Sequence, residues 1–248
     1  MSSRAVLITG ASRGVGRATA IAFAARGDRV AVHHRDSAAA AELVHTQLAG
    51  SGHVIVQADL AQPAAIATMV EAAAAALGGI DVVVNNAARY EPHPITDVSY
   101  DDWQAQWRAT IDVNLLGAAN VAYCAIKHMK SGGRIVNVSS RGAFRGEPRQ
   151  PAYGASKAGL NAMGQSLAVA LAPLGIAVAT VAPGWVETDM SNRDLKSPRG
   201  PDARAQSPFN RVARPEEVAA AILWLASPEA EWASGAVLDL NGASYLRT

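Results

Sequence analysis

The chain has 248 residues, enough for one large α/β domain or two small ones, and half of them are hydrophobic, so a sizeable core can form. A formal net charge of +1 argues against a nucleic-acid-binding surface, which would need a concentrated basic stripe. Cys124 is the only cysteine, which excludes an intramolecular disulfide; in its apolar helical stretch we expect a buried small side chain rather than a nucleophile.

No segment approaches about 18 uninterrupted apolar residues, so we expect no transmembrane helix and no membrane partner. A strand-like segment follows the first four residues directly and leaves no room for a signal peptide. A cytoplasmic location is therefore the expectation.

Short apolar runs alternate with longer helical patterns along the chain. The runs are rich in Val and Ile and apolar on both faces, as strands covered by helices on both sides should be. We expect strands at 5–9, 29–33, 53–57, 80–85, 134–139, 176–182 and 236–240, and helices at 14–26, 38–49, 63–77, 100–129, 152–171 and 215–226. The alternation predicts a single α/β domain over residues 1–248, a Rossmann-type doubly wound parallel sheet of about seven strands with helices on both faces.

The main irregular stretch is polar and lies at 191–210. It carries Pro198, Pro201 and Pro208 together with three arginines. A long polar insertion in a compact domain is usually a functional lid or a disordered loop. We expect a substrate lid near residues 188–210.

The first strand leads into a glycine-rich turn, Thr-Gly-Ala-Ser-Arg-Gly-Val-Gly at 9–16, and a helix follows at once. Glycines allow the backbone to turn tightly and approach a pyrophosphate, while the helix N-terminus supplies unpaired N–H groups. A plain strand-to-helix turn is the alternative. The position at the first strand–helix junction of a parallel sheet favours a dinucleotide site.

The end of the second strand indicates which dinucleotide binds. A site for NAD usually offers an acidic residue to the ribose 2′-OH there, but this chain reads His33-His34-Arg35. Arg35, with Arg13 in the glycine turn, would suit a 2′-phosphate, which arginine binds bidentately. We therefore predict NADP(H), with NAD(H) possible because Asp36 follows Arg35. No third ligand lies at a metal-binding spacing from the two histidines, so no metal site is expected.

Tyr153 and Lys157 are four residues apart, so on a helix they share one face. A free phenol titrates near ~10, too high for a base at neutral pH. A neighbouring ammonium favours the phenolate and lowers that pKa. The pair therefore predicts an acid/base group able to work near pH 7.

These motifs together resemble the short-chain dehydrogenase/reductase family nearly end to end, with acyl-carrier-protein ketoreductase-like members most similar in overall appearance. The matching motifs are the glycine turn at 9–16, Asp59-Leu60, Asn85-Asn86-Ala87-Ala88, Asn114, Ser139-Ser140, Tyr153-x-x-x-Lys157 and Pro183-Gly184-x-x-x-Thr188. The fourth-strand motif departs from the family at Ala88, where glycine is common.

The resemblance implies four catalytic residues. Tyr153 would give its proton to the substrate carbonyl in reduction, and Ser140 would hold that carbonyl beside it. Lys157 would lower the pKa of Tyr153 and bind the nicotinamide ribose, and Asn114 would hold a water linking Lys157 to solvent. Ser139 would be structural.

The resemblance also implies a cofactor site at the carboxyl ends of the strands. Its residues would be Gly10, Ser12, Arg13, Gly14, Val15, Gly16, His34, Arg35, Asp59, Leu60, Asn86, Ala87, Ala88, Tyr153, Lys157, Pro183, Gly184, Val186 and Thr188. Local roles remain as alternatives: Asn85 and Asn86 would cap a strand end, Asp59 the following helix, and Thr188 would be an N-cap.

The candidate substrate contacts combine aromatic side chains with arginines. They are Arg89, Tyr90, Arg141, Gly142, Ala143, Phe144, Gln150, Trp185, Val186 and the stretch 191–210. This composition suits a small carbonyl compound with a flat or aliphatic body and an anionic or carrier-linked tail.

Three functions follow in order of preference. The first is an NADP(H)-dependent oxidoreductase that transfers a hydride between nicotinamide and a carbonyl or secondary alcohol. The second is a 3-oxoacyl thioester (acyl-carrier-protein) reductase, and the third a non-catalytic dinucleotide-binding sensor. By resemblance the assembly would be a homotetramer, with a dimer second.

Overall fold

The computed structural model describes residues 3–247 and contains one parallel sheet with the strand order β3-β2-β1-β4-β5-β6-β7. The strands are β1 (Ala5–Ile8), β2 (Arg29–His34), β3 (Val54–Gln57), β4 (Val82–Asn85), β5 (Arg134–Val138), β6 (Ala177–Pro183) and β7 (Val237–Leu240). Strand order reverses between β1 and β4, which pair with each other in parallel. A crevice that binds ligands is expected outside this switch point.

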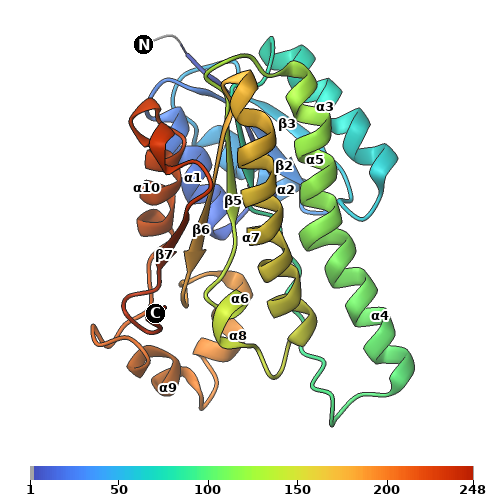
Figure 1. Cartoon of the computed structure of the whole chain (residues 1–248), viewed down its shortest axis with the longest axis vertical. Coiled ribbons are helices and arrows are strands. Elements are labelled where there is room, and N and C mark those ends of the chain that lie inside the picture. Colours follow the sequence, from blue (N-terminus) through green and yellow to red (C-terminus); the bar gives the residue numbers. More distant parts are fainter. Residues whose placement is uncertain (1–2, 248) are drawn as a thin grey trace.

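Helices cover both faces of the sheet (Figure 1). The long ones are α1 (Gly14–Ala24), α2 (Ala38–Thr46), α3 (Pro63–Leu77), α4 (Tyr100–Ile111), α5 (Ala118–Ala125), α7 (Pro151–Leu171) and α10 (Pro215–Leu225), and the short ones are α6 (Gly142–Arg145), α8 (Asp189–Leu195) and α9 (Gly200–Ala205). One core cluster joins the sheet to α1, α2 and α10, and the other joins it to α3, α5 and α7.

Alternate side chains of each strand enter opposite clusters. Val6 and Ile8 of β1 pack toward α1, whereas Ala5 and Leu7 pack toward α3, and all four are buried. This follows from the two-residue repeat of a strand and explains why the strands lack an alternating polar pattern. The predicted fold class is therefore confirmed, with element ends shifted by one to three residues.

The stretch at 191–210 differs from the sequence expectation because it is not irregular. It contains most of α8 and all of α9, and Pro201 stands in the first turn of α9, where its missing N–H is no loss. With α6 these short helices gather at the lower end of Figure 1, beyond the carboxyl ends of the strands.

The predicted long helix at 100–129 is interrupted by a π-helical turn, Asp112–Gly117. Such turns are frequent at functional sites, and this one contains Asn114. Close packing accompanies it, since a Cβ at Gly117 would lie 2.8 Å from the Leu60 carbonyl oxygen. The irregularity thus sets where Asn114 faces.

The helical run Tyr100–His128 is long and apolar enough to cross a bilayer by length and composition, with a mean hydropathy of 1.3 in its most apolar window. This differs from the expectation that no segment would qualify. The run lies against α3 and α7, and a helix that covers a sheet meets the same two criteria.

Helix α7 lies so close to the sheet at Gly164 that a Cβ there would be 2.9 Å from Asn137 Nδ2 and 3.0 Å from Thr180 Oγ1. At Gly159, on the same helix, a Cβ would meet only the flexible end of Leu115. Alanine favours a helix interior over glycine by about 1 kcal/mol, but overpacking costs about 1–3 kcal/mol. We predict that Gly159→Ala is at least as stable as the native protein.

In the same denaturant titration Gly164→Ala should be less stable than Gly159→Ala by about 1–3 kcal/mol. Equal stabilities would contradict the close contact that positions α7.

Candidate active site

The glycine turn between β1 and α1 requires glycine at three places. Gly10 and Gly14 have φ values of 64° and 54°, in the left-handed region. A Cβ at Gly16 would overlap the Gly10 carbonyl oxygen and lie 2.6 Å from Asn86 Nδ2. The turn is therefore a cradle that any side chain would fill, placed at the N-terminus of α1, where anions bind.

Asn86 supports this turn from the end of β4. Its Nδ2 donates to the carbonyl oxygens of Thr9 at 2.8 Å and Gly10 at 3.1 Å. In return, Thr9 Oγ1 accepts hydrogen bonds from the backbone N–H groups of Asn86 and Ala87 at 2.9 and 3.0 Å. Because the Asn86 amide binds the turn, it serves the site by holding its shape.

His33 is a second support of the turn, whereas the sequence alone indicated strand-end packing and a place in the adenosine pocket. The Gly10 N–H donates to His33 Nδ1 at 2.9 Å, so Nε2 carries the proton and donates to the Ala58 carbonyl oxygen at 3.0 Å. The ring is buried, and burial lowers the pKa of His33 to about 4. A neutral imidazole therefore ties the glycine turn to the ends of β2 and β3.

The residues predicted to surround the adenosine differ in exposure. His34 is buried and its Nδ1 has no hydrogen-bond partner among the described residues, so a polar atom there is available to a ligand. Arg13 and Arg35 are exposed, and Arg35 Nε is paired with the Asp36 carboxylate at 2.5 Å. Asp59 Oδ1 accepts from the Ala61 N–H at 2.9 Å, but the N-cap residue of α3 is Gln62, so the alternative that Asp59 caps this helix is wrong.

The segment that follows β6 also contacts the glycine turn. A Cβ at Gly14 would lie 3.1 Å from Thr188 Cγ2, so the start of α8 meets the start of α1. Thr188 is the N-cap residue of α8, as the alternative reading had it, and Val186 forms a parallel bridge with Ala213. Gly184 packs against Asn241, where a Cβ would lie 3.1 Å from the Asn241 Cα.

The remaining cofactor candidates from the sequence take up positions around this cradle. Ser12 and Val15 are partly buried within the turn, Leu60 is buried beside the π-helical turn, Ala88 is partly buried, and Pro183 ends β6. The glycine turn, Asn86, Ala87 and Thr188 are thus brought together, and they fit a dinucleotide pyrophosphate.

Lys157 lies at the centre of the candidate catalytic group. Its side chain is 2% exposed, and Nζ donates to the Val138 carbonyl oxygen at 2.7 Å. Burial lowers the pKa of Lys157 to about 7. Nζ is 5.6 Å from the centroid of the Tyr153 ring, so the two groups share one pocket without a direct bond.

The phenol of Tyr153 has a raised pKa. Burial raises it to about 12, although the hydrogen bond with Ser140 acts in the opposite direction, and the Glu147 carboxylate raises it further. The expected lowering by Lys157 is not met in the protein alone, because the Lys157 ammonium binds Val138 and is itself disfavoured by burial. Desolvation therefore outweighs the interaction between the two residues.

The serines before α6 have different roles. Ser140 Oγ accepts from the Gly142 N–H at 3.0 Å, and this hydroxyl lies near enough to the Tyr153 phenol to act to lower its pKa. Ser139 Oγ donates to the Lys157 carbonyl oxygen at 3.2 Å, which is the structural role expected for it. Tyr90 packs edge-to-face on Tyr153, with ring centroids 4.8 Å apart.

The side chain of Asn114 hydrogen-bonds to the loop after β4. Its Oδ1 accepts from the Arg89 N–H at 2.7 Å, and its Nδ2 donates to the Arg89 carbonyl oxygen at 3.0 Å. Nδ2 also donates to Ser156 Oγ at 3.0 Å, and Ser156 Oγ donates to the Tyr153 carbonyl oxygen at 2.8 Å. Ser156 thus links Asn114 to the Tyr153 backbone, a role that the sequence analysis missed. Its position directly before Lys157 was the only sequence feature that pointed to it.

Among residues 3–247, no group of three His, Cys, Asp or Glu side chains is arranged to hold a metal ion. The chemistry available at the described site is that of a phenol, a hydroxyl and an amine beside a cradle for phosphate groups.

Comparison with known proteins gives consistent matches over the whole chain. The profile of a family described as enoyl-(acyl carrier protein) reductase matches residues 10–242. A cis-4-hydroxycyclohexanecarboxylate dehydrogenase of Sinomonas cyclohexanicum is 37% identical, covering 97% of this chain and 96% of the relative. A 3-oxoacyl-[acyl-carrier-protein] reductase of Synechocystis is 34% identical, covering 99% and 98%.

Among solved structures, a short-chain dehydrogenase of Burkholderia cenocepacia in complex with NADP is 33% identical with a TM-score of 0.90, covering 98% of this chain and 97% of that one.

The lowered pKa of His33 predicts an acid-sensitive contribution to stability. As the pH falls from 6.5 towards 4, His33 becomes protonated in the unfolded chain but stays neutral in the folded protein. The free energy of unfolding therefore decreases by up to about 3 kcal/mol. Above pH 6.5 that contribution is fully present. In His33→Gln, which can still hydrogen-bond but does not titrate, denaturant unfolding should show a shallower loss across this window; an identical acid slope would contradict the neutral-imidazole tie.

Proposed function

The chain belongs to the short-chain dehydrogenase/reductase family of oxidoreductases, and we propose that it is an NADP(H)-dependent enzyme that interconverts a carbonyl compound and a secondary alcohol. The observation that carries this proposal is the grouping of Ser140, Tyr153 and the buried amine of Lys157 at the carboxyl end of β5, where Ser140 acts to lower the pKa of the Tyr153 phenol. That position faces the same edge of the sheet as the glycine turn.

NADP(H) is the proposed cofactor, and when bound it would supply or accept the hydride. The glycine turn would hold its pyrophosphate, and Thr188 would close over it from α8. Arg13 and Arg35 would hold a 2′-phosphate, for which Arg35 must leave Asp36. The NADP complex of the B. cenocepacia relative supports this proposal.

In the proposed reduction, Ser140 donates a hydrogen bond to the substrate carbonyl oxygen and Tyr153 gives that oxygen its proton. Because its pKa is raised, the Tyr153 phenol is protonated at neutral pH and has a proton to give to the developing oxyanion. Lys157, whose pKa is near neutral, can return a proton to Tyr153. Asn114 fixes the Arg89 loop, and a water bound near it would link Lys157 to solvent.

A 3-oxoacyl thioester reductase is the second candidate. The Synechocystis relative carries that name, and its identity of 34% is similar to that of relatives named for other substrates. A sensor without turnover is the third candidate, and the presence of Ser140, Tyr153, Lys157 and Asn114 together argues against it.

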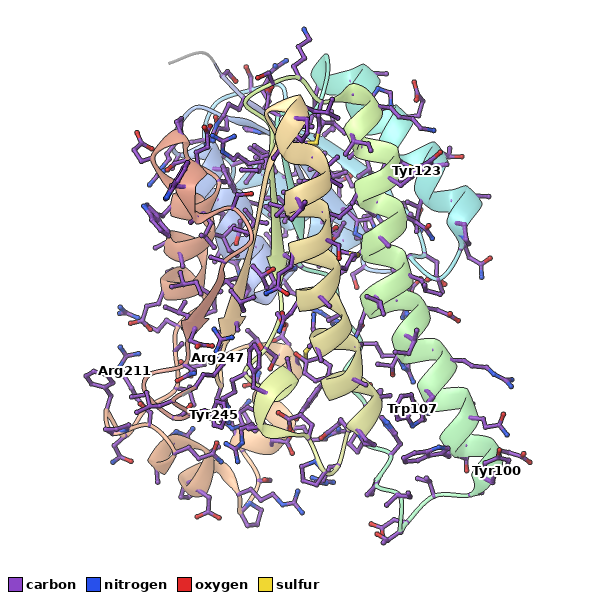
Figure 2. All side chains as sticks on the ribbon, in the orientation of Figure 1. Tyr100, Trp107, Tyr123, Arg211, Tyr245 and Arg247 are labelled. Atoms are coloured by element: carbon purple, nitrogen blue, oxygen red, sulfur yellow. The ribbon has the colours of Figure 1, made fainter. Side chains whose placement is uncertain are left out.

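The proposed assembly is a homotetramer, with a dimer second, in the cytoplasm. Exposed large side chains support this assembly. They lie along the helical run 100–128, at Tyr100, Leu116 and Tyr123, and at Val169 on α7. Figure 2 shows Tyr100 and Tyr123 at the outer side of that run. Such a face is expected to be covered by a second copy.

Tyr153→Phe tests the assigned acid. Removing one hydroxyl should leave NADPH binding intact but lower kcat for ketone reduction by several orders of magnitude, because the proposed proton donor to the carbonyl oxygen is lost. The measurement pairs a fluorescence titration of NADPH with steady-state kinetics on a panel of ketones and 3-oxoacyl thioesters. Turnover close to that of the native enzyme would refute the role of Tyr153.

The cofactor preference has its own test. NADPH should bind at least about tenfold more tightly than NADH, and Arg35→Ala should remove most of this difference. Arg17→Ala, which removes another exposed arginine of the same region bonded to Gln47, serves as the matched control and should keep the preference. Equal affinity of the native protein for both dinucleotides would contradict the proposal.

A further inference from the structure

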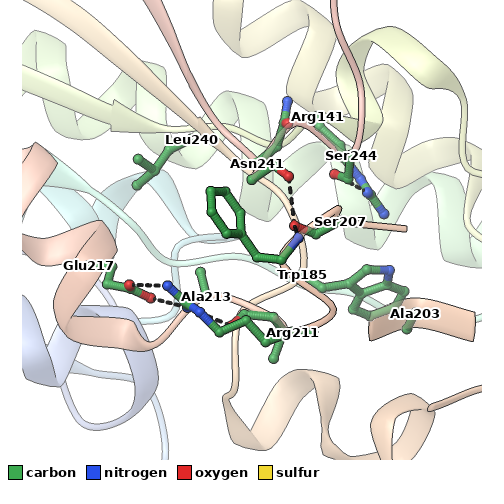
Figure 3. A pocket seen from close by; sticks show the side chains of 13 residues that line it. Arg141, Trp185, Ala203, Ser207, Arg211, Ala213, Glu217, Leu240, Asn241 and Ser244 are labelled. Atoms are coloured by element: carbon green, nitrogen blue, oxygen red, sulfur yellow. Dashed lines mark hydrogen bonds and ion pairs between the residues drawn. The ribbon is translucent and has the colours of Figure 1, made fainter. Parts of the chain in front are cut away.

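A cavity of about 180 Å³ opens between the ends of β6 and β7, the segment at 203–213 and the C-terminal segment (Figure 3). One of its walls is Arg141, the residue directly after Ser140. Trp185, Phe209, Val212 and Leu240 make much of the rest apolar. Arg141 thus connects this cavity, which can hold a compact apolar body, to the loop that carries Ser140.

Only three charged side chains line this cavity in the described part of the chain: Arg141, Arg211 and Glu217. Arg211 and Glu217 cancel one another, because Nη1 and Nη2 donate to the two carboxylate oxygens at 2.8 and 2.7 Å. Figure 3 shows this pair at the opposite side of the cavity from Arg141 and Ser244. The uncompensated charge of the cavity is the guanidinium of Arg141.

Arg141 is 5% exposed, yet its hydrogen-bond acceptors are neutral. Nη1 donates to Ser244 Oγ and Nη2 to Gln206 Oε1, and Arg145 Nη1 donates to the same amide oxygen at 3.0 Å. Among residues 3–247, neither arginine forms an ion pair with a carboxylate. Two guanidinium groups thus converge on one uncharged oxygen.

This arrangement lacks an anion to balance the two guanidinium groups. A buried cation without an anion is unfavourable, and burial lowers the pKa of Arg141 to about 10. Glu147 attracts Arg141 from nearby, but burial raises the pKa of that carboxyl group as well. A ligand carboxylate in place of Gln206 Oε1 would match the fork of Arg141 and meet Arg145.

We propose that Arg141, assisted by Arg145, binds the carboxylate of an anionic substrate whose apolar body fills the cavity beside Trp185 and Phe209. The substrate class is a compact keto acid or hydroxy acid. Gln206, on the lid, occupies the carboxylate position until the ligand displaces it. The carboxylate site follows from the cavity alone, whereas the keto or hydroxy group rests on the proposed function.

Binding of an unreactive pair of ligands tests the site without turnover. Cyclohexanecarboxylate and the uncharged cyclohexanecarboxamide have nearly the same shape, and calorimetric titration into the native protein with saturating NADPH should show at least a tenfold preference for the acid. Arg141→Gln should abolish that preference. Arg199→Gln, which removes an exposed lid arginine outside the cavity, should retain it.

Gln206→Glu gives a second test that does not remove a buried group. It places a carboxylate where the two arginines already converge, so it should raise the thermal midpoint and abolish acid binding. Equal binding of acid and amide by the native protein, no binding of either, or a preference that survives in both Arg141→Gln and Gln206→Glu, would each overturn the proposal.

Turnover separates this inference from the proposed function. With NADPH, 4-oxocyclohexanecarboxylate should be reduced with a kcat/KM at least tenfold above that of its methyl ester. Acid binding without reduction of any ketone would overturn the proposed function and leave the carboxylate site standing. Reduction of the ester as fast as the acid would overturn the carboxylate site and leave the proposed function standing.

Discussion

The structure depends on burying the amine of Lys157. Its hydrogen bond to the Val138 carbonyl oxygen joins α7 to the end of β5 and sets where Tyr153 stands on the next turn. Removing an amine from water disfavours its charge, and the same desolvation disfavours a phenolate. The protein thus holds a protonated phenol beside an amine that titrates near neutrality, which is a pair suited to passing one proton.

The other half of the site depends on close backbone approach. The glycine turn is held between His33 on β2, Asn86 after β4 and Thr188 before α8, so three loops from different parts of the sheet converge on one cradle. No charged side chain of the described residues takes part in these three contacts. The turn is preorganised by neutral hydrogen bonds and packing, which leaves positive charge at the rim for a phosphate.

Much of this arrangement could be predicted from local pattern. Val-rich runs predicted the strands of a parallel sheet, and the spacing of Tyr153 and Lys157 predicted that they share one helix, which is α7. The rest depends on tertiary contacts that spacing does not encode. His33 acts through Gly10 and Ala58, which are distant in sequence. The π-helical turn at Asn114 and the raised pKa of Tyr153 arise from packing, and the short helices α8 and α9 form in a stretch whose prolines indicated a loop.

The pH dependence of unfolding tests the buried amine most directly. The pKa of Lys157 is about 7 in the folded protein and ordinarily 10.5, so between these pH values the unfolded chain holds one proton more. The free energy of unfolding should therefore rise with pH across that window by on the order of 5 kcal/mol. Lys157→Met should remove this rise. A native protein whose stability is flat from pH 7 to 10, or a variant that keeps the same slope, would contradict the account.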